Sequence, residues 1–226
     1  MKKTVLLSWS SGKDSAWALH VLRRDPDVEV VGLFTTVNQA FQRVAMHAVR
    51  VELLQAQAAA LGLPLRQVSI PYPCSNEDYA SRMADFVSAC RADGVSHMAF
   101  GDLFLEDVRV YREQSLAGSG IAPLFPLWGL STAELAQTML RGGLKARLTC
   151  LDPRKLPRGL AGSEFGQALL DALPPDADPC GEYGEFHSFA WDGPMFLRPV
   201  PHAVGETVER DGFVFTDLLP LDTQRG

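Results

Sequence analysis

The stretch from Ser8 to Ser15 constrains this 226-residue chain more than any other. It reads Ser-Trp-Ser-Ser-Gly-Lys-Asp-Ser, and it lies between an apolar run at Thr4–Leu7 and a run with an apolar stripe at Ala16–Leu22. These patterns predict a buried strand, a tight turn of small residues and a helix. The first N–H groups of a helix lack partners within it, and the helix dipole adds positive charge there. The stretch therefore predicts an anion-binding loop.

The side chains of this stretch suit a phosphate ligand. Ser10, Ser11 and Ser15 add hydroxyl donors, and Lys13 adds an ammonium group. It is not a Walker A loop, because that motif needs a glycine where Leu7 stands and a serine or threonine where Asp14 stands. The phosphate-binding geometry must therefore follow another pattern.

The stretch resembles the PP-loop, S-G-G-K-D-S, of the ATP pyrophosphatases, which cleave ATP to AMP and pyrophosphate. In this chain the motif runs from Ser10 to Ser15, and Ser11 takes the place of the first glycine. If that position requires a positive φ, Ser11 strains the backbone; otherwise the replacement is harmless. An ordinary strand–turn–helix connection with a surface lysine is the alternative, and the near match along the motif disfavours it.

Strand-like and helix-like patterns alternate along most of the chain. Strands are expected at 28–36, 65–70, 97–101, 121–128 and 145–151, and helices at 47–61, 75–92, 103–117 and 131–141. The alternation predicts an α/β fold with a mainly parallel sheet covered on both faces. Ser75 and Ser131 are expected N-caps, and Gly62 is an expected C-terminal cap. The polar run Asn38–Ala45 predicts a mobile loop, followed by His47 on the surface.

Beyond about Asp152 the composition changes. Proline, glycine and aspartate become frequent, and only Gly162–Leu173 is typical of a helix. Asp211-Gly212 is a hairpin signal between two alternating runs. We therefore expect a nucleotide-binding α/β domain at 1–128 and a smaller α+β subdomain on the substrate side at 129–226.

The carboxyl ends of parallel strands are where open α/β sheets bind ligands. Three groups are expected to meet there: the loop, the end of the second strand and Gly101-Asp102. The predicted nucleotide-binding residues are Ser8, Ser10, Ser11, Gly12, Lys13, Asp14, Ser15, Phe34, Thr35, Gly101 and Asp102. Because Mg²⁺ prefers carboxylates together with phosphate oxygens, Asp102 is the candidate metal ligand, and a helix N-cap is its alternative role.

The stretch from Cys180 to His187 is rich in reactive side chains. It contains two carboxylates, a thiol and an imidazole, and strand alternation would place Glu185 and His187 on one face, opposite Phe186. The residue types allow a metal site, but their spacing matches no zinc motif. A substrate-recognition loop is favoured over a metal site and over a glycine-rich turn that leads into an edge strand.

Several motifs together resemble the diphthine–ammonia ligase family, whose members are also called adenine nucleotide alpha hydrolase-like proteins. These motifs are the PP-loop, Gly101-Asp102 with the following charged helix, Phe125–Gly129 and Cys180–His187. The family's late motif is usually C-G-E-N-G-E-F-H, and Tyr183 replaces its asparagine here. The resemblance covers the chain from Thr4 to about Pro194 and implies a Rossmann-like (HUP-type) fold.

The resemblance implies an ATP-dependent amide (C–N) ligase with ATP and Mg²⁺ as cofactors. The acceptor would be a carboxylate, diphthine-like on a protein or on a small molecule, and ammonium would supply nitrogen. The carboxylate becomes an acyl-adenylate, and ammonia then displaces AMP. Lys13 would stabilise charge on pyrophosphate, and Asp14 would orient Lys13 or Mg²⁺. Glu182, Glu185 and His187 would shape the acceptor side or deprotonate ammonium.

Two other classes of function remain open at this stage. A tRNA-modifying PP-loop enzyme predicts a basic face and, for many thiolases, paired cysteines. The net charge here is −6, and the four cysteines, Cys74, Cys90, Cys150 and Cys180, are scattered. A non-catalytic adenine-nucleotide-binding module is the second alternative. With no long apolar run and no signal-peptide pattern, we expect a cytoplasmic protein without membrane or nucleic-acid partners. The sequence leaves a homodimer open.

Overall fold

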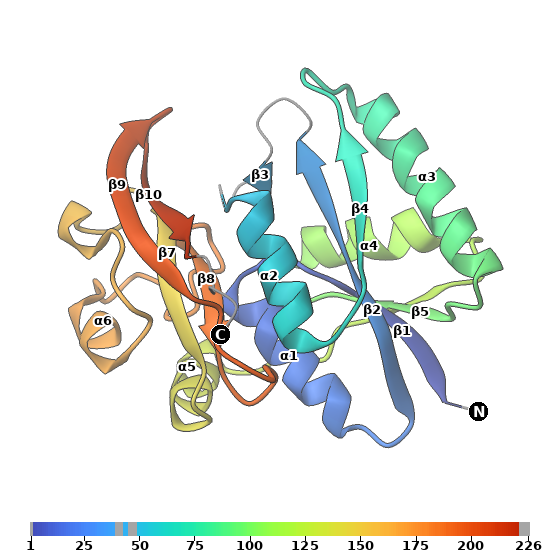
Figure 1. The fold of residues 1–226 in the computed structure, drawn as a ribbon, viewed down its shortest axis with the longest axis horizontal. Coiled ribbons are helices and arrows are strands. Elements are labelled where there is room, and N and C mark those ends of the chain that lie inside the picture. The colour runs from blue at the N-terminus through green and yellow to red at the C-terminus, as the bar shows by residue number, and fades with distance from the viewer. Residues whose placement is uncertain (1, 39–42, 45–48, 222–226) are drawn as a thin grey trace.

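The structure, a computed structural model, describes residues 2–38, 43–44 and 49–221. Its first sheet has five parallel strands in the order β4-β2-β1-β5-β6 (Figure 1). Their bounds are β1 Lys3–Ser8, β2 Val28–Asn38, β4 Leu65–Ile70, β5 His97–Ala99 and β6 Ala122–Leu124. A short strand, β3 (Arg43–Val44), pairs antiparallel with the end of β2. The expected Rossmann-like α/β architecture is confirmed.

Helices cover both faces of this sheet. Their bounds are α1 Lys13–Arg24, α2 Val51–Leu61, α3 Asn76–Ala92 and α4 Glu106–Leu116. Along β1 the side chains alternate: Val5 and Leu7 belong to the core cluster that includes α1 and α2, whereas Leu6 packs in a second cluster with α3 and α4. Each face of the central strand therefore has its own apolar core.

The second sheet is antiparallel, with the order β8-β7-β10-β9. Its strands are β7 Lys145–Leu151, β8 Phe186–Asp192, β9 His202–Arg210 and β10 Phe213–Pro220. The Lys145–Leu151 strand was expected to continue the parallel sheet, and that expectation is wrong, because β7 pairs antiparallel with β8 and β10. The predicted hairpin turn is confirmed: Asp211 has φ 52° and Gly212 has φ 79° between β9 and β10.

Local signals set most helix ends, although several expected elements are shorter in the structure. The Ser75 and Ser131 hydroxyls accept hydrogen bonds from Asp78 N and Glu134 N, at the starts of α3 and α5 (Thr132–Arg141). Gly62 ends α2 in the left-handed region with φ 66°. The helix expected from Gly162 is only α6, Gln167–Ala172, after a short 3-10 helix, η1, at Arg158–Leu160. Before α6, Gly162 lies in a turn with φ 71°, and Glu164 forms an isolated antiparallel bridge with Arg147.

The two sheets share one apolar core. Residues of α1 such as Trp17 and Leu19 belong to the same buried cluster as Phe189 and Met195 of the C-terminal half. The polar run Asn38–Ala45 lies mostly, and His47 wholly, outside the described residues. Among the described residues, no helix combines the length and the apolar character needed to cross a membrane.

Candidate active site

The loop after β1 lies beside the end of β5 and beside the later part of β2, which continues to Asn38. Ser8 is in register with Phe34 of β2, and Leu7 is in register with Ala99 of β5. Trp9 N donates to Phe34 O over 2.7 Å. The segment after β5 also approaches closely, because a Cβ atom on Gly101 would lie 3.1 Å from Ser15 N. The three groups expected at the strand ends are therefore neighbours in the structure.

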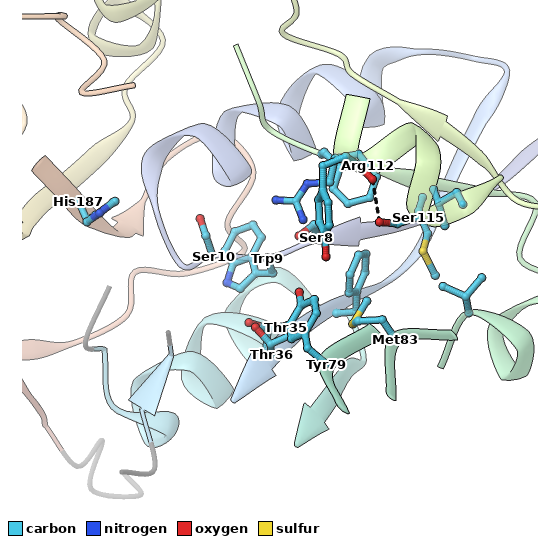
Figure 2. A pocket seen from close by; sticks show the side chains of 16 residues that line it. Ser8, Trp9, Ser10, Thr35, Thr36, Tyr79, Met83, Arg112, Ser115 and His187 are labelled. Carbon is cyan, nitrogen blue, oxygen red and sulfur yellow. Dashed lines mark hydrogen bonds between the residues drawn. The ribbon is translucent and has the colours of Figure 1, made fainter. Parts of the chain in front are cut away.

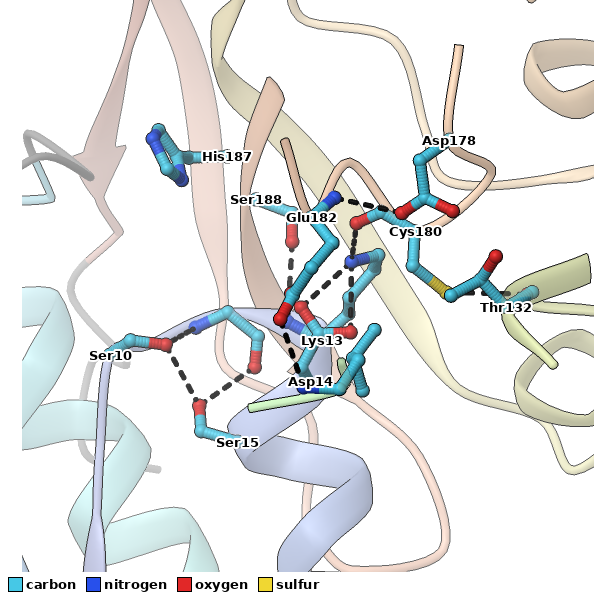
Figure 3. Close-up of polar contacts among 12 residues, drawn as sticks. Ser10, Lys13, Asp14, Ser15, Thr132, Asp178, Cys180, Glu182, His187 and Ser188 are labelled. Carbon is cyan, nitrogen blue, oxygen red and sulfur yellow. Dashed lines mark hydrogen bonds and ion pairs between the residues drawn. The ribbon is translucent and has the colours of Figure 1, made fainter. Parts of the chain in front are cut away.

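Hydroxyl groups fix the shape of this loop (Figure 3). The Ser10 and Ser15 hydroxyls lie 3.1 Å apart, Gly12 N donates to Ser10 Oγ over 3.3 Å, and Ser15 Oγ donates to Gly12 O over 3.0 Å. Gly12 is the N-cap of α1 and provides no side-chain cap. From the second sheet, Ser188 Oγ accepts from Lys13 N over 3.2 Å. The loop is thus a short turn rich in donors at a helix N-terminus.

Ser11 has an unusual backbone and an unusual side chain. Its φ is 71°, a left-handed conformation that only Asp211 shares among the non-glycine residues described. The residue is fully buried, and its hydroxyl has no hydrogen-bond partner in the described structure. This position does require a positive φ, so the replacement of the motif's glycine by Ser11 carries strain.

Lys13 is a buried ammonium in a polar cage. Its Nζ lies 2.9 and 2.8 Å from the two carboxylate oxygens of Asp14 and also donates to the carbonyl of Cys180. It lies 5.2 Å from the centroid of the Phe186 ring. Burial lowers the pKa of Lys13, but Asp14 and other nearby acidic groups outweigh burial, so the pKa lies above its usual value. The side chain is therefore a permanent positive charge.

The Cys180–His187 segment packs over the loop and brings Glu182 to the site. The Glu182 carboxylate accepts from Leu103 N over 2.9 Å, and Asp178 accepts from Glu182 N over 2.8 Å. Burial raises the pKa of Glu182 to about 7, and the charges of Asp14 and Asp102 act in the same direction. Gly181, with φ 72°, permits the sharp turn. This carboxyl can therefore gain or lose a proton near neutral pH.

Two adjoining cavities open at the loop. One, of about 300 Å³, is largely apolar, and the other, of about 270 Å³, is lined by charged groups. Residues of the apolar cavity include Phe34, Thr35, Thr36, Tyr79, Met83, Met98, Tyr111 and Ser115 (Figure 2). Residues of the polar cavity include Lys13, Asp14, Ser15, Gly101, Asp102, Gly181, Glu182 and Ser188. Both are lined by Ser8, Ser10, Phe100, Arg112 and His187.

His187 reaches both cavities from β8 (Figures 2 and 3). Burial lowers the pKa of this imidazole to about 4, and the nearby charge of Lys13 adds to the effect. His187 is therefore uncharged at neutral pH. A neutral imidazole can accept a hydrogen bond without adding charge beside a phosphate.

Two residues of the late segment, Glu185 and Cys180, have buried side chains held by hydrogen bonds within the fold. Glu185 lines neither cavity: it is buried, and its carboxylate accepts from Asp178 N over 3.1 Å. It lies in the turn before β8, so strand alternation does not place it on the face of His187. The Cys180 thiol donates to Thr132 O, and burial raises its pKa to about 12. That thiol is not a thiolate nucleophile at neutral pH.

Asp102 lines the polar cavity, and its carboxylate accepts from Arg112 Nε over 3.3 Å. It does not cap a helix, because α4 begins at Glu106 and Leu105 is its N-cap. Among the described residues, no group of three or more His, Cys, Asp or Glu side chains could hold a metal ion by itself. A metal here would need oxygen ligands from a bound substrate as well.

The charged helix α4 supplies a site residue that sequence reasoning missed. On its surface, Arg109 and Glu113 form an ion pair of 2.8 Å. Arg112, however, lines both cavities and lies 4.8 Å from the centroid of the Phe100 ring. Leu105, Val108 and Arg112 have the spacing of residues that share one face of a helix. This spacing could have indicated from the sequence that Arg112 lies on the same face as the apolar residues beside the site.

A parallel sheet with a donor-rich loop after its first strand, a buried lysine in that loop and an adjoining apolar cavity define a PP-loop protein of the ATP pyrophosphatase class. The comparison with known families agrees. The model described as the diphthamide synthase N-terminal domain matches residues 1–122, more than half of the chain. The chain belongs to this family, the diphthine–ammonia ligase family of PP-loop proteins. No curated protein matches it significantly.

The strain at Ser11 leads to a stability prediction. Ser11→Gly removes both the left-handed penalty and the unpartnered buried hydroxyl, although glycine loses more entropy on folding. We expect a net stabilisation of about 1 kcal/mol. Urea unfolding of wild type and variant measures it, and Ser119→Gly serves as a control at a serine with partners. A Ser11→Gly variant less stable than wild type would contradict the strain.

The raised pKa of Glu182 leads to a pH-dependent prediction. The folded protein holds this proton up to a pH of about 7, whereas the unfolded chain releases it near its ordinary pKa of 4.5. This contribution to stability is complete below pH 4.5 and disappears as the pH rises through 7. Relative to Glu182→Gln, wild type should lose stability over that window and then level off. Parallel urea titrations at several pH values check this, and a constant difference would contradict it.

Proposed function

We propose that this protein is an ATP-dependent, AMP-forming amide (C–N) ligase of the diphthine–ammonia ligase type. The observation that carries the proposal is the permanent charge of Lys13, held at the junction of the PP-loop and the Cys180–His187 segment. The charge lies beside the cavity that both segments line. This arrangement supports a reaction in which a pyrophosphate leaves on one side and an acceptor approaches on the other.

The two cavities suggest how ATP would lie. The apolar cavity, with Phe34, Met83 and Phe100, suits an adenine ring, and Thr35 and Thr36 offer polar groups at its edge. The polar cavity would take the phosphates, close to Ser10, Lys13 and the start of α1. Since Ser10 lines both cavities, the α-phosphate would lie near their junction. The proposal assigns nucleotide binding to residues 1–128 and presentation of the acceptor to residues 129–226.

The proposed reaction has two steps. An oxygen of the acceptor carboxylate forms a bond to the α-phosphorus, and the bond from that phosphorus to pyrophosphate breaks. Ammonia then forms the C–N bond, the bond to AMP breaks, and the proton that nitrogen loses passes to a nearby base. Lys13 and Arg112 would offset charge on the phosphates. Glu182, with its pKa of about 7, would receive the proton, and neutral His187, which is a weaker base with its pKa of about 4, would shape the acceptor side.

The polar cavity also suits a magnesium ion carried with the nucleotide. Asp14, Asp102 and Glu182 place three carboxyl groups on its wall, against the cations of Lys13 and Arg112. A triphosphate would therefore meet three carboxyl groups and only two cations. Asp102, with Asp14 beside it, would hold Mg²⁺ together with phosphate oxygens. When bound, the ion would neutralise charge on the transferring phosphate.

The other functional classes have less support. All four cysteines are free, and Cys90, Cys150 and Cys180 are buried, so no cysteine pair of the kind used in many tRNA thiolations is available. Burial raises the pKa of Cys150 to about 12, as it does for Cys180. A nucleotide-binding module without turnover would use the same cavities and is distinguished by its products.

Product analysis of ATP labelled at the α-phosphate tests the proposal. The protein would be incubated with Mg²⁺ and ammonium, with and without a cytosolic small-molecule extract. We expect labelled AMP that depends on an added acceptor, because the acceptor carboxylate is the nucleophile. Labelled ADP would overturn the pyrophosphatase chemistry. Tight ATP binding without any AMP, with both small-molecule and protein acceptors, would favour the non-catalytic module.

Removal of the loop charge provides a second test. Lys13→Met retains the apolar stem and removes the ammonium, so AMP formation should fall on the order of 100-fold or more. Lys2→Met, at an exposed lysine before β1, is the matched control and should leave the rate unchanged. Thermal unfolding of both variants separates lost charge from lost structure. A folded Lys13→Met protein with the wild-type rate would remove Lys13 from the mechanism.

A further inference from the structure

We infer that Gln57, a buried glutamine of α2, is the positioning residue that sets the conformation of the PP-loop. The role of Gln57 in catalysis rests on the proposed function. Gln57 is fully buried and lines neither cavity. Any effect that it has on a bound nucleotide must therefore pass through its hydrogen-bond partners, which lie in the loop and in β8.

The side-chain amide of Gln57 has three hydrogen-bond partners. Its Oε1 accepts from Trp9 Nε1 over 2.9 Å, and its Nε2 donates to Ser11 O over 3.0 Å and to Ala190 O over 2.6 Å. Trp9 and Ser11 belong to the loop, and Ala190 belongs to β8 in the second sheet. One side chain thus joins the loop, the helix α2 and the other sheet.

The hydrogen bonds to the Ser11 carbonyl determine the direction in which the Gly12 N–H points. The Ser11 carbonyl accepts both from Gln57 and from Ala190 N, at 2.9 Å for the latter. In a trans peptide, the carbonyl and the following N–H point in opposite directions. With the Ser11 carbonyl held toward the core, Gly12 N–H faces the opposite way and donates to Ser10 Oγ. We call the hydrogen bonds of Gln57 to Trp9 and Ser11 the clamp. Since Ser10 lines both cavities, the clamp directs a backbone donor toward the phosphate side.

The clamp also explains how a strained residue persists at this position. A left-handed, non-glycine residue is retained only where surrounding contacts over-determine its backbone. Ser11 has such contacts through its own carbonyl, and they come from two separate elements. Without Gln57, Ser11 would keep one of the two bonds and could relax toward a negative φ. Relaxation would rotate the Ser11–Gly12 peptide and turn the Gly12 N–H away from Ser10.

The test is a double-mutant cycle between the clamp and the strain. Gln57→Met keeps the length of the side chain and removes its polar atoms, and Gln55→Met, on the exposed face of the same helix, is the matched control. Each is made in the wild-type and Ser11→Gly backgrounds. Calorimetry measures affinity for an ATP analogue with a methylene group between the α- and β-phosphorus, thermal unfolding measures stability, and amide NMR reports the Gly12 N–H.

Gln57→Met should weaken analogue affinity on the order of tenfold in the wild-type background. In the Ser11→Gly background the loss should be markedly smaller, because glycine adopts the left-handed conformation without a clamp. The loss of thermal stability should be no larger in the wild-type background than in the Ser11→Gly background, because relaxation of Ser11 releases backbone strain that the Ser11→Gly protein lacks. The Gly12 amide resonance should move in Gln57→Met and return toward its wild-type position in the double variant. Gln55→Met should change none of these.

An unchanged affinity and an unmoved Gly12 resonance in a folded Gln57→Met protein would overturn the inference. Equal affinity losses in the two backgrounds would also overturn it, since they would indicate a general structural effect. A wild-type protein that does not bind the analogue would refute the proposed function instead. The Gly12 resonance, which needs no ligand, would then still decide whether Gln57 sets the loop conformation.

Discussion

The buried charge of Lys13 is the interaction on which the rest of the site depends. An ammonium removed from water is costly unless a counter-charge and hydrogen-bond acceptors surround it. Asp14 supplies the counter-charge from the same helix, and the Cys180 carbonyl supplies an acceptor from a segment 167 residues away. The phosphate loop is therefore completed only when the C-terminal half folds against the parallel sheet.

A second long-range constraint acts on the other side of the loop. Ser11 departs from the glycine that its backbone would favour, and contacts from α2 and β8 hold it there. Lys13 and Ser11 are thus both fixed by elements that follow the loop in the chain. The loop sequence specifies the donors, and the surrounding elements specify their directions. This division explains why a short motif identifies the class of protein but does not by itself make a binding site.

The parts of the fold that were predictable from the sequence are those with local causes. Apolar periodicity indicated the parallel strands, and Gly62, Ser75 and Ser131 marked helix ends because their cap geometry involves only nearby residues. The strand Lys145–Leu151 was assigned to the wrong sheet for the opposite reason. It follows a helix, as a parallel strand would, and its apolar pattern suits either sheet. Its partners, β8 and β10, lie far along the chain, and pairing with them determines which sheet the strand joins.

The same distinction applies to the site. Motif residues with charged side chains, such as Lys13 and Glu182, could be found from the sequence, whereas Glu185 could not be placed because its turn interrupts strand alternation. Gln57 carried a signal of another kind: it is the polar residue on the face of α2 that otherwise buries leucine and alanine. A buried amide must find partners. A lone glutamine on an apolar face therefore indicates that some backbone with unpaired polar groups packs against it, and here that backbone is the PP-loop.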